Sequence, residues 1–564
     1  MGKCAHHQSV YGSVHLTRPR DCSRPVMLVG FQRMDNLGLG YLSSTLRSCG
    51  YPVLTYDFQD DPDTIIAAAQ SRNPLLLGFS LIFEFYLRRF QALARLLRNS
   101  NVACHFTVGG HFPTLGYEQT LSAIPELDSL VRGEGELTLL ELADLLSLCQ
   151  DWRSVSGIAY RNHEEIIVNA PRPLIANLDV LPYPDRPAEL KAIVGQSVAP
   201  ILASRGCPRS CAFCSIRTFY SSSPGALVRT RNPAELVKEM QMLHSERGAT
   251  VFLFQDDEFQ LWCAAARDWT RCFLRGLHEA GLSRRILWKI SCRADDVDVE
   301  LFRQMRDAGL FFVYLGLESG HQEGLKVLGK QTTVAQNMRA VSILKDLDLG
   351  LGYGFMMFEP CSTLESIRQN VGFLRDIVAD GSAAVTFCRM FAYEGTPIKR
   401  GLVRSGRLHG GIGDPYYDFL DTRVQRCFET LTTIVDLKEW IGGSALLPVY
   451  VNSALTEVSV VRRLLPPVRD LQSYSETVRQ IARESNAFIL QVVEDISYRV
   501  SDDRHYEWTK ETISANCRRY LERLRAARNE FLEQNHGLLI SLVLGSDGDG
   551  QYAGPAPQSF SQCA

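Results

Sequence analysis

Three cysteines on one short segment constrain this chain more than any other feature. The segment SRGCPRSCAFCSIR places Cys207, Cys211 and Cys214 in a C-x3-C-x2-C spacing, directly after a predicted strand. The other cysteines, of sixteen in all, are scattered along the chain. Three thiolates on one loop can hold three corners of an iron-sulfur cube, so the motif predicts a four-iron cluster.

Zinc and unliganded core cysteines are the alternatives for this loop. A structural zinc site takes four ligands in two close pairs, whereas the nearest downstream candidates, His244 and Cys263, lack that spacing. The missing fourth cysteine favours a cluster that acts on a small molecule, because an iron without a protein ligand can bind one. We therefore expect a catalytic iron-sulfur cluster.

The composition is that of a globular enzyme. With 564 residues the chain exceeds what one hydrophobic core usually supports, so two or three domains are expected. A net charge of -3 gives no support to nucleic-acid binding. The sequence contains no apolar run of the roughly 18 residues that a membrane span needs, and no signal-peptide core at its start. We expect a cytoplasmic protein without a nucleic-acid or membrane partner.

Two stretches alternate short apolar strands with helical segments, which predicts an α/β protein. The first, residues 25–150, predicts a Rossmann-like doubly wound domain, and the second, residues 197–400, suits a partial (β/α)6 barrel. Strands are expected at Met27 to Gly30, Val53 to Asp57, Leu75 to Ser80, Cys104 to Val108, Ser129 to Arg132, Ala199 to Ser204, Val251 to Gln255, Ile286 to Cys292, Phe311 to Glu318, Leu351 to Phe358 and Ala384 to Phe391.

The other segments break this rhythm. Residues 151–196 contain a predicted hairpin and a proline-bearing stretch, and are expected to form a connector. Residues 401–545 predict a mainly helical C-terminal region. Residues 1–24 form an N-terminal tail, and residues 546–564 are rich in Gly, Pro and Ser, which predicts disorder.

The cysteine loop, with the aromatic Phe213 before its last cysteine, resembles that of the radical S-adenosylmethionine superfamily. In that superfamily the amine and carboxylate of S-adenosylmethionine chelate the open iron. An electron from the cluster then breaks the sulfonium bond and gives a 5'-deoxyadenosyl radical. The resemblance implies that Cys207, Cys211 and Cys214 hold a [4Fe-4S] cluster and that Phe213 lies beside the cofactors.

The resemblance continues at the ends of the following predicted strands, in FQDDEF, CRAD and LGLESG. Polar groups at carboxyl ends of barrel strands are where barrel enzymes build active sites. Taken alone, the acidic run could be a solvated helix cap, and Arg293 could pair with Asp295 at the surface. The resemblance implies that the first S-adenosylmethionine is held by Gln255, Asp256, Asp257, Arg293, Glu318 and Ser319, with Arg293 and Glu318 at the reacting centre.

The N-terminal domain carries glycine-rich segments after its predicted strands: MDNLGLGYLSS, GFS, VGGHFPT and VRGEGE. The carboxyl ends of strands in such a sheet converge on one crevice. The pattern looks like the cobalamin-binding domain that precedes the radical barrel in a large subgroup of the superfamily. The implied cofactor contacts are Asn36, Gly38, Ser80, Gly109, Gly110, Gly133 and Glu134.

One departure from cobalamin domains stands out. Many carry an Asp-x-His-x-x-Gly motif whose histidine ligates cobalt, but the matching loop here runs from Asp35 to Gly38 without a histidine. The resemblance therefore implies cobalt held without a protein imidazole. His111 is the only histidine in a plausible loop, and a lone histidine is a weak metal signal. The alternative is a domain that packs on the barrel without any cofactor.

The resemblance covers residues 25–400 and implies a cobalamin-dependent radical enzyme supplied by a flavodoxin- or ferredoxin-type reductant. In that subgroup the commonest reaction is methylation of an unactivated carbon, or occasionally phosphorus, in a natural-product or cofactor precursor. A carbon without an acidic proton offers no nucleophile, so a radical supplies the reactivity. A non-methylating cyclase or rearrangement enzyme, and a non-catalytic iron-sulfur sensor or binding protein, are the alternatives.

Overall fold

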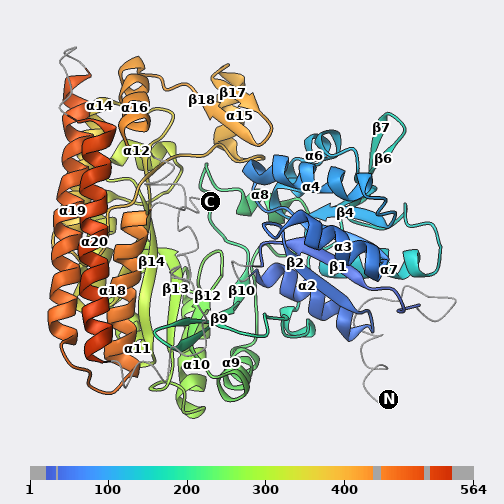
Figure 1. Ribbon diagram of the computed structural model, residues 1–564, viewed down its shortest axis with the longest axis horizontal. Helices are drawn as coiled ribbons and strands as arrows, with labels where there is room; N and C mark the ends of the chain where they lie inside the picture. The colour runs from blue at the N-terminus through green and yellow to red at the C-terminus, as the bar shows by residue number, and fades with distance from the viewer. Residues whose placement is uncertain (1–20, 33–35, 436–445, 501–507, 536–564) are drawn as a thin grey trace.

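The computed structural model describes residues 21–32, 36–435, 446–500 and 508–535. An N-terminal α/β domain, a central curled sheet and a set of long C-terminal helices stand side by side (Figure 1). This arrangement confirms the predicted fold class. Asp35, nearly all of the predicted N-terminal tail and the whole of the predicted C-terminal tail lie outside the described residues.

The N-terminal sheet has the strand order β2-β1-β3-β4-β5-β6-β7. Its first five strands are parallel and are β1 (Val26–Gly30), β2 (Val53–Asp57), β3 (Leu76–Ser80), β4 (His105–Gly109) and β5 (Ser129–Val131). The chain reverses its direction of winding between β1 and β3, and ligands of such sheets bind at the carboxyl ends beside that point.

Helices cover both faces of this sheet. On one face the apolar sides of α2 (Leu37–Ser48) and α7 (Glu136–Ser147) pack together over Val26 and Leu28. On the other face α3 (Pro62–Arg72), α4 (Leu87–Asn99) and α6 (Tyr117–Ala123) cover Met27 and Val29. Successive strand residues point to opposite faces, so β1, apolar throughout, is buried on both sides.

The hairpin of β6 (Ile158–Asn162) and β7 (Glu165–Val168) extends this sheet. β6 pairs antiparallel with β5, so the sheet has seven strands. The sequence placed this hairpin in a connector, and the remaining connector includes the short helix η2 (Leu178–Val180).

The second sheet has the order β16-β15-β14-β13-β12-β9-β8 and does not close on itself. Its parallel strands are β9 (Gln196–Ile201), β12 (Ala249–Phe254), β13 (Leu287–Arg293), β14 (Leu310–Glu318), β15 (Gly350–Phe358) and β16 (Cys388–Arg389), with β8 (Lys191–Ile193) antiparallel at one edge. Its helices are α9 (Pro233–Arg247), α10 (Ala264–Glu279), α11 (Val299–Asp307), α12 (Gln322–Val327), α13 (Val334–Asp346) and α14 (Leu364–Val378).

β16 is much shorter than the predicted strand at residues 384–391. The backbone N–H groups of Ala384 and Val385 are bound by the side-chain oxygens of Asn452 and Asn486. Tyr353 also donates its hydroxyl hydrogen to the Ala384 carbonyl, 3.1 Å away. Side chains therefore satisfy backbone groups that a longer ladder with β15 would have used.

The C-terminal region is mainly helical, as predicted. It comprises α15 (Pro397–Arg404), α16 (Thr422–Ile434), α18 (Leu446–Leu464), α19 (Leu471–Arg499) and α20 (Lys510–Gln534), and a hairpin of β17 (Leu408–Gly411) and β18 (Asp414–Tyr417) that the sequence did not predict. The helices α18 to α20 lie against α14, β14 and β15, on the side of the curled sheet away from the N-terminal domain (Figure 1).

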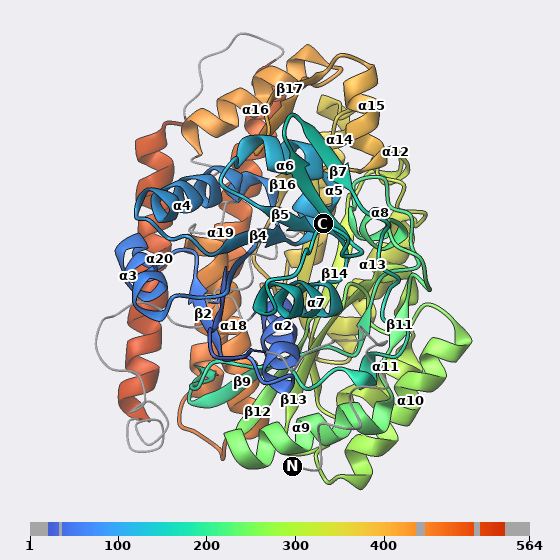
Figure 2. The same cartoon turned by 90° about the vertical axis from the view of Figure 1, so that its right-hand side faces the viewer.

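Figure 2 looks at the N-terminal domain from outside, where it stands in front of the strands of the curled sheet. The carboxyl ends of β3 and β4 face the second sheet, since Ser80 and Gly109 line one cavity together with Gln255 and Asp257. None of the helices in the described ranges has both the length and the apolar character needed to cross a membrane.

Candidate active site

The cysteine loop joins β10 (Ser204–Arg205) to α8 (Ile216–Ser221). Its first turn depends on Gly206, which has φ +91°, and an added Cβ there would lie 1.8 Å from the Leu227 carbonyl oxygen. The Gly206 N–H donates to Asp257 over 2.8 Å. Further along, Ala212 N–H donates to the Leu328 carbonyl and Ala212 carbonyl accepts from Ile398 N–H. Contacts with three distant segments thus hold the loop in shape.

The three thiols have different neighbours. Cys207 donates to Glu258 Oε2 over 3.0 Å, and Cys211 Sγ accepts from Arg293 Nη1 over 3.6 Å. Cys214 packs against Ile216 and its neighbours in α8. Burial raises the pKa of Cys207 and raises that of Cys214 to about 12. Iron must therefore displace protons from these thiols when it binds.

The donor set fits an iron-sulfur cluster. All three cysteines are free thiols on one loop. Among the described residues no three His, Cys, Asp or Glu side chains converge on a position for a single metal ion. A cube holds its thiolates at separate corners, so three thiols spaced along one loop suit it.

Glu318 ends β14 in an uncommon conformation, with φ +63°. Its Oε1 accepts from Lys330 Nζ over 3.0 Å, and both side chains are buried. Within the described part of the chain, Glu318 Oε2 is buried and has no hydrogen-bond partner. A buried carboxylate oxygen without a partner is costly unless a ligand completes it. This oxygen therefore fits a bound cofactor that carries hydrogen-bond donors.

A row of glycines in β15 makes room for the side chains of β14. An added Cβ at Gly350 would lie 2.7 Å from the Phe312 ring, and one at Gly352 would lie 2.9 Å from it. At Gly354 the Cβ would lie 3.1 Å from the Tyr314 hydroxyl oxygen and 3.2 Å from Glu318 Oε2. The β14 side chains therefore lie across bare β15 backbone.

The other residues predicted to hold S-adenosylmethionine divide into two groups. Asp256 accepts from Ala203 N–H and the Ser204 hydroxyl, so its carboxylate ties β12 to the cysteine loop. Phe213 is buried in the core, and Ser319 Oγ donates to Asn370 Oδ1 over 3.0 Å. The remaining two, Gln255 and Asp257, line a cavity shared with the N-terminal domain.

That cavity has a volume of about 300 Å³ and lies between the two sheets. The structure brings together on its wall every residue predicted for cobalamin: Asn36, Gly38, Ser80, Gly109, Gly110, Gly133 and Glu134. Gly110 has φ +120°, and an added Cβ would lie 2.4 Å from the Leu81 carbonyl oxygen. Asn36 Nδ2 is buried without a partner among the described residues. The wall therefore fits a polar ligand close to the backbone.

The opposite wall comes from the segments that flank the cysteine loop. Arg205, Phe219 and Tyr220 line the cavity there, and the sequence did not single them out. His111 also lines it, with its ring 4.2 Å from the Phe219 ring, and burial lowers the pKa of His111 to about 4. Position close before and after the cysteine motif was the available signal for Arg205, Phe219 and Tyr220.

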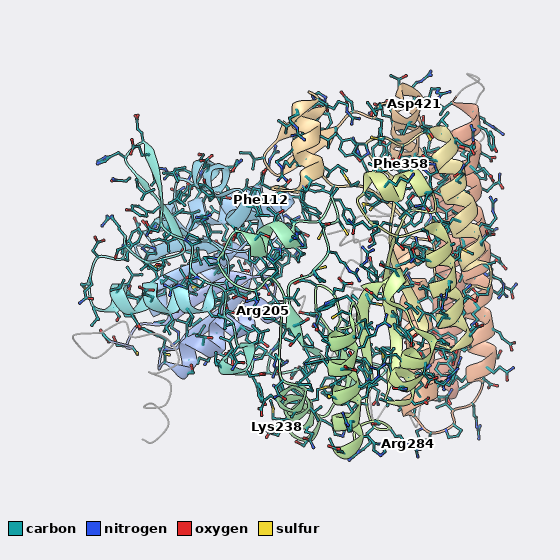
Figure 3. The ribbon with its side chains drawn as sticks, turned by 180° about the vertical axis from the view of Figure 1, so that it is seen from behind. Phe112, Arg205, Lys238, Arg284, Phe358 and Asp421 are labelled. Carbon is teal, nitrogen blue, oxygen red and sulfur yellow. The ribbon has the colours of Figure 1, made fainter. Side chains whose placement is uncertain are left out.

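Buried ion pairs hold the two domains together at this cavity. Figure 3 shows Arg205 where the N-terminal domain meets the curled sheet. Arg205 Nη1 lies 2.9 Å from Glu134 Oε1, and Arg205 also pairs with Glu136. Arg229 Nη1 lies 2.9 Å from Glu134 as well. Both Glu134 oxygens therefore bind protein groups, and Glu134 holds the cavity wall of the N-terminal domain against the segments around the cysteine loop.

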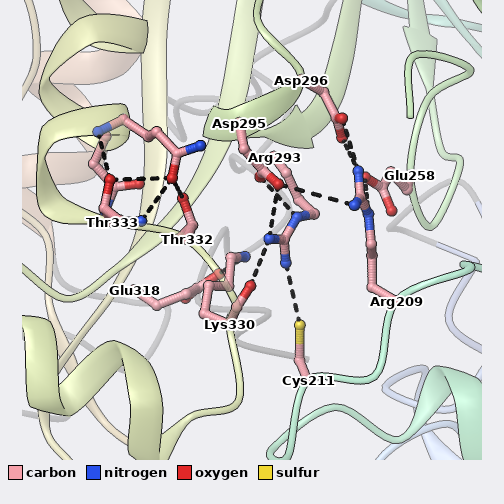
Figure 4. A network of polar contacts seen from close by, with 12 residues as sticks. Arg209, Cys211, Glu258, Arg293, Asp295, Asp296, Glu318, Lys330, Thr332 and Thr333 are labelled. Atoms are coloured by element: carbon pink, nitrogen blue, oxygen red, sulfur yellow. Dashed lines mark hydrogen bonds and ion pairs between the residues drawn. The ribbon is translucent and has the colours of Figure 1, made fainter. Parts of the chain in front are cut away.

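A polar network surrounds the end of β13 beside the cysteine loop (Figure 4). Arg293 pairs with Asp295 over 2.8 Å, with side chains 7% and 16% exposed. The pair that the sequence suggested at the surface is therefore largely buried. Arg209 binds Asp296 and reaches Glu258 over 3.3 Å. Burial raises the pKa of Glu258 to about 7.

Comparison with known families matches the two sheets separately. The model of the B12 binding domain matches residues 24–143, and that of the radical SAM superfamily matches residues 201–373. An uncharacterized methyltransferase of Pyrococcus horikoshii is 29% identical over 354 residues, which cover 61% of this chain and 74% of that protein.

An anaerobic magnesium-protoporphyrin IX monomethyl ester cyclase of Synechocystis is 31% identical over 327 residues. The match covers 56% of this chain and 62% of the cyclase, which is less than two thirds of its length. Among solved structures, OxsB, a cobalamin-dependent S-adenosylmethionine radical enzyme with aqua-cobalamin and S-adenosylmethionine bound, aligns with a TM-score of 0.63 and 19% identity, over 95% of this chain and 84% of that chain. The chain therefore combines a B12 binding domain with a domain of the radical SAM superfamily.

Proposed function

We propose that this enzyme transfers a methyl group from S-adenosylmethionine, by way of cobalamin, to an unactivated carbon or phosphorus of a small natural-product or cofactor precursor. The observation that carries the proposal is the cavity of about 300 Å³ between the sheets. One wall consists of the predicted cobalamin contacts, and the other contains Gln255 and Asp257, beside the cysteine loop. A methyl carrier held there would lie next to the radical centre.

In this proposal Cys207, Cys211 and Cys214 hold the cluster, which when loaded supplies the electron that cleaves S-adenosylmethionine. The unpartnered Glu318 Oε2 accepts a hydrogen bond from the amine or ribose of S-adenosylmethionine. Gln255 and Asp257 line the cavity, on the side toward the bound S-adenosylmethionine. Asp256, Phe213 and Ser319 act indirectly, by fixing the loop and strand ends that carry the other groups.

The N-terminal wall would hold cobalamin through backbone approach at its glycines and through Asn36 Nδ2, which has no partner among the described residues. The proposed electron donor is a flavodoxin- or ferredoxin-type protein. We propose a cytoplasmic location, since the redox chemistry of three free thiols suits a reducing compartment.

By-products of turnover test the proposal before the substrate is known. The full chain, loaded anaerobically with iron, sulfide and cobalamin, is given a strong reductant and S-adenosylmethionine with a deuterated methyl group. Methyl transfer predicts two products, 5'-deoxyadenosine from the radical half and S-adenosylhomocysteine from the methyl half. Cys211→Ala abolishes 5'-deoxyadenosine, whereas Cys272→Ala, at an exposed cysteine, leaves it unchanged.

The cyclase relative, 31% identical, makes a non-methylating radical reaction the second candidate. That reaction also forms 5'-deoxyadenosine but transfers no methyl group. Formation of 5'-deoxyadenosine without any S-adenosylhomocysteine would therefore reject methyl transfer and favour the cyclase-like reaction.

A further inference from the structure

Two cationic side chains, Arg293 and Lys330, interact with Cys211. Arg293 Nη1 donates to Cys211 Sγ over 3.6 Å (Figure 4). Lys330 Nζ, whose side chain is 6% exposed, also interacts electrostatically with Cys211. The thiolate that would bind iron at this corner therefore faces positive charge at close range.

Several bonds fix the direction in which Arg293 points. Its Nε and Nη2 atoms bind the two oxygens of Asp295, over 2.8 and 3.0 Å. Nη2 also donates to the Lys330 carbonyl oxygen. With this edge of the planar guanidinium occupied, Nη1 is left directed at the sulfur. The contact with Cys211 is thus preorganised rather than one of several rotamers.

Cys207 has the opposite environment. Its sulfur lies 3.0 Å from Glu258 Oε2, and Glu258 in turn is 3.3 Å from Arg209. One cluster corner therefore faces a carboxylate, and another faces a guanidinium. Hydrogen bonds and charge around the sulfurs are among the factors that set the reduction potential of an iron-sulfur cluster.

We propose that Arg293 is a positioning residue that raises the reduction potential of the cluster through its hydrogen bond to the Cys211 thiolate. A charge-assisted N–H···S bond withdraws electron density from the sulfur and stabilises the reduced, more negative cluster. The role differs from direct contact with S-adenosylmethionine. It depends on the cluster assignment and not on methyl transfer, so either proposal can fail alone.

A redox titration of the full reconstituted chain tests this role. The reduced cluster is followed by paramagnetic resonance without S-adenosylmethionine, and iron content is measured in every sample. In Arg293→Gln we expect the ratio of reduced to oxidised cluster at a given potential to fall about tenfold, which for one electron equals about 59 mV. Arg463→Gln, which removes an arginine of α18 that pairs with Asp348 before β15, should leave the ratio unchanged.

Asp295→Asn should shift the ratio of reduced to oxidised cluster in the opposite direction. It removes the carboxylate that offsets Arg293 while keeping the guanidinium, so the reduced fraction should rise. General loosening of the site would move both variants in one direction. If Arg293→Gln binds no iron, Arg293→Lys takes its place, with a smaller fall expected because lysine lacks the planar donor edge. Unchanged potentials, or shifts of the same sign in the Arg and Asp variants, overturn the proposal.

Discussion

Glu134→Gln should destabilise the junction between the two domains. Glu134 is 7% exposed and pairs with Arg205 and Arg229, which are 10% and 3% exposed. It also accepts from the Ile175 N–H over 2.8 Å. Glutamine keeps the shape but removes the charge, so two buried guanidinium groups lose their shared partner.

Arg205 and Arg229 differ in the hydrogen-bond partners that they keep in Glu134→Gln. Arg205 keeps its pair with Glu136, whereas Arg229 Nε and Nη2 have no hydrogen-bond partner among the described residues. Removing one partner of a buried pair costs about 3 to 5 kcal/mol. Because Arg205 stays compensated, we expect the lower end, about 3 kcal/mol.

The pH must be chosen with the charge of Glu134 in mind. Burial raises its pKa, but Arg205 and Arg229 outweigh this and hold the pKa below its usual 4.5. A carboxylate with a lowered pKa stabilises the fold above about pH 4.5 and loses that contribution as the pH falls further. The full effect should therefore be present at pH 7.5.

Urea unfolding followed by tryptophan fluorescence at pH 7.5 measures the change. The first transition of Glu134→Gln should move to lower urea concentration. The matched control is Glu235→Gln, because Glu235 pairs with Lys238 at the surface, where the side chains are 40% and 63% exposed, and such pairs contribute less than about 1 kcal/mol. Equal midpoints for the two variants would refute the argument that this buried pair fastens the domains.

Two further variants test single positions. Gly206→Ala should lose most of its iron after reconstitution, because its Cβ would lie 1.8 Å from the Leu227 carbonyl oxygen. Gly281→Ala is the control, since Gly281 also has a positive φ but lies in open space, and it should keep its iron. Equal iron contents in the two variants would contradict this prediction. His111→Phe should flatten the loss of stability between pH 6.5 and 4, measured by thermal unfolding. Burial lowers the pKa of His111 to about 4, so acid favours the unfolded state by up to about 1.4 kcal/mol per pH unit, and parallel curves for parent and variant would contradict it.

The strand series could be predicted because buried parallel strands are short apolar runs bounded by turns. β2 begins and ends where the sequence placed it, at Val53 and Asp57. The short length of β16 could not be predicted, since the N–H groups of Ala384 and Val385, before the strand, are bound by Asn452 and Asn486 far along the chain. Side-chain partners at that separation leave no local pattern.

The site shows the same division. The cysteine motif and the glycine-rich strand ends are local signals, and they identified the cysteine loop and one wall of the cavity. The partners of Glu134 lie 71 and 95 residues away in sequence, so its ion pairs between the two domains could not be read from the local sequence. Asp256 and Asp257 both bind the segment that leads into the cysteine motif, at Ala203 and at Gly206, and of the two Asp257 lines the cavity.

The bare backbone of β15 also constrains which substitutions this sheet can accept. Phe312 and Tyr314 occupy the space above Gly350, Gly352 and Gly354, so a larger residue in β15 would collide with them. The two strands must therefore vary together, with growth in one matched by truncation in the other. A smaller residue at Phe312 would create volume over the start of β15 without moving any backbone, so it is the natural partner of a larger residue at Gly350 or Gly352.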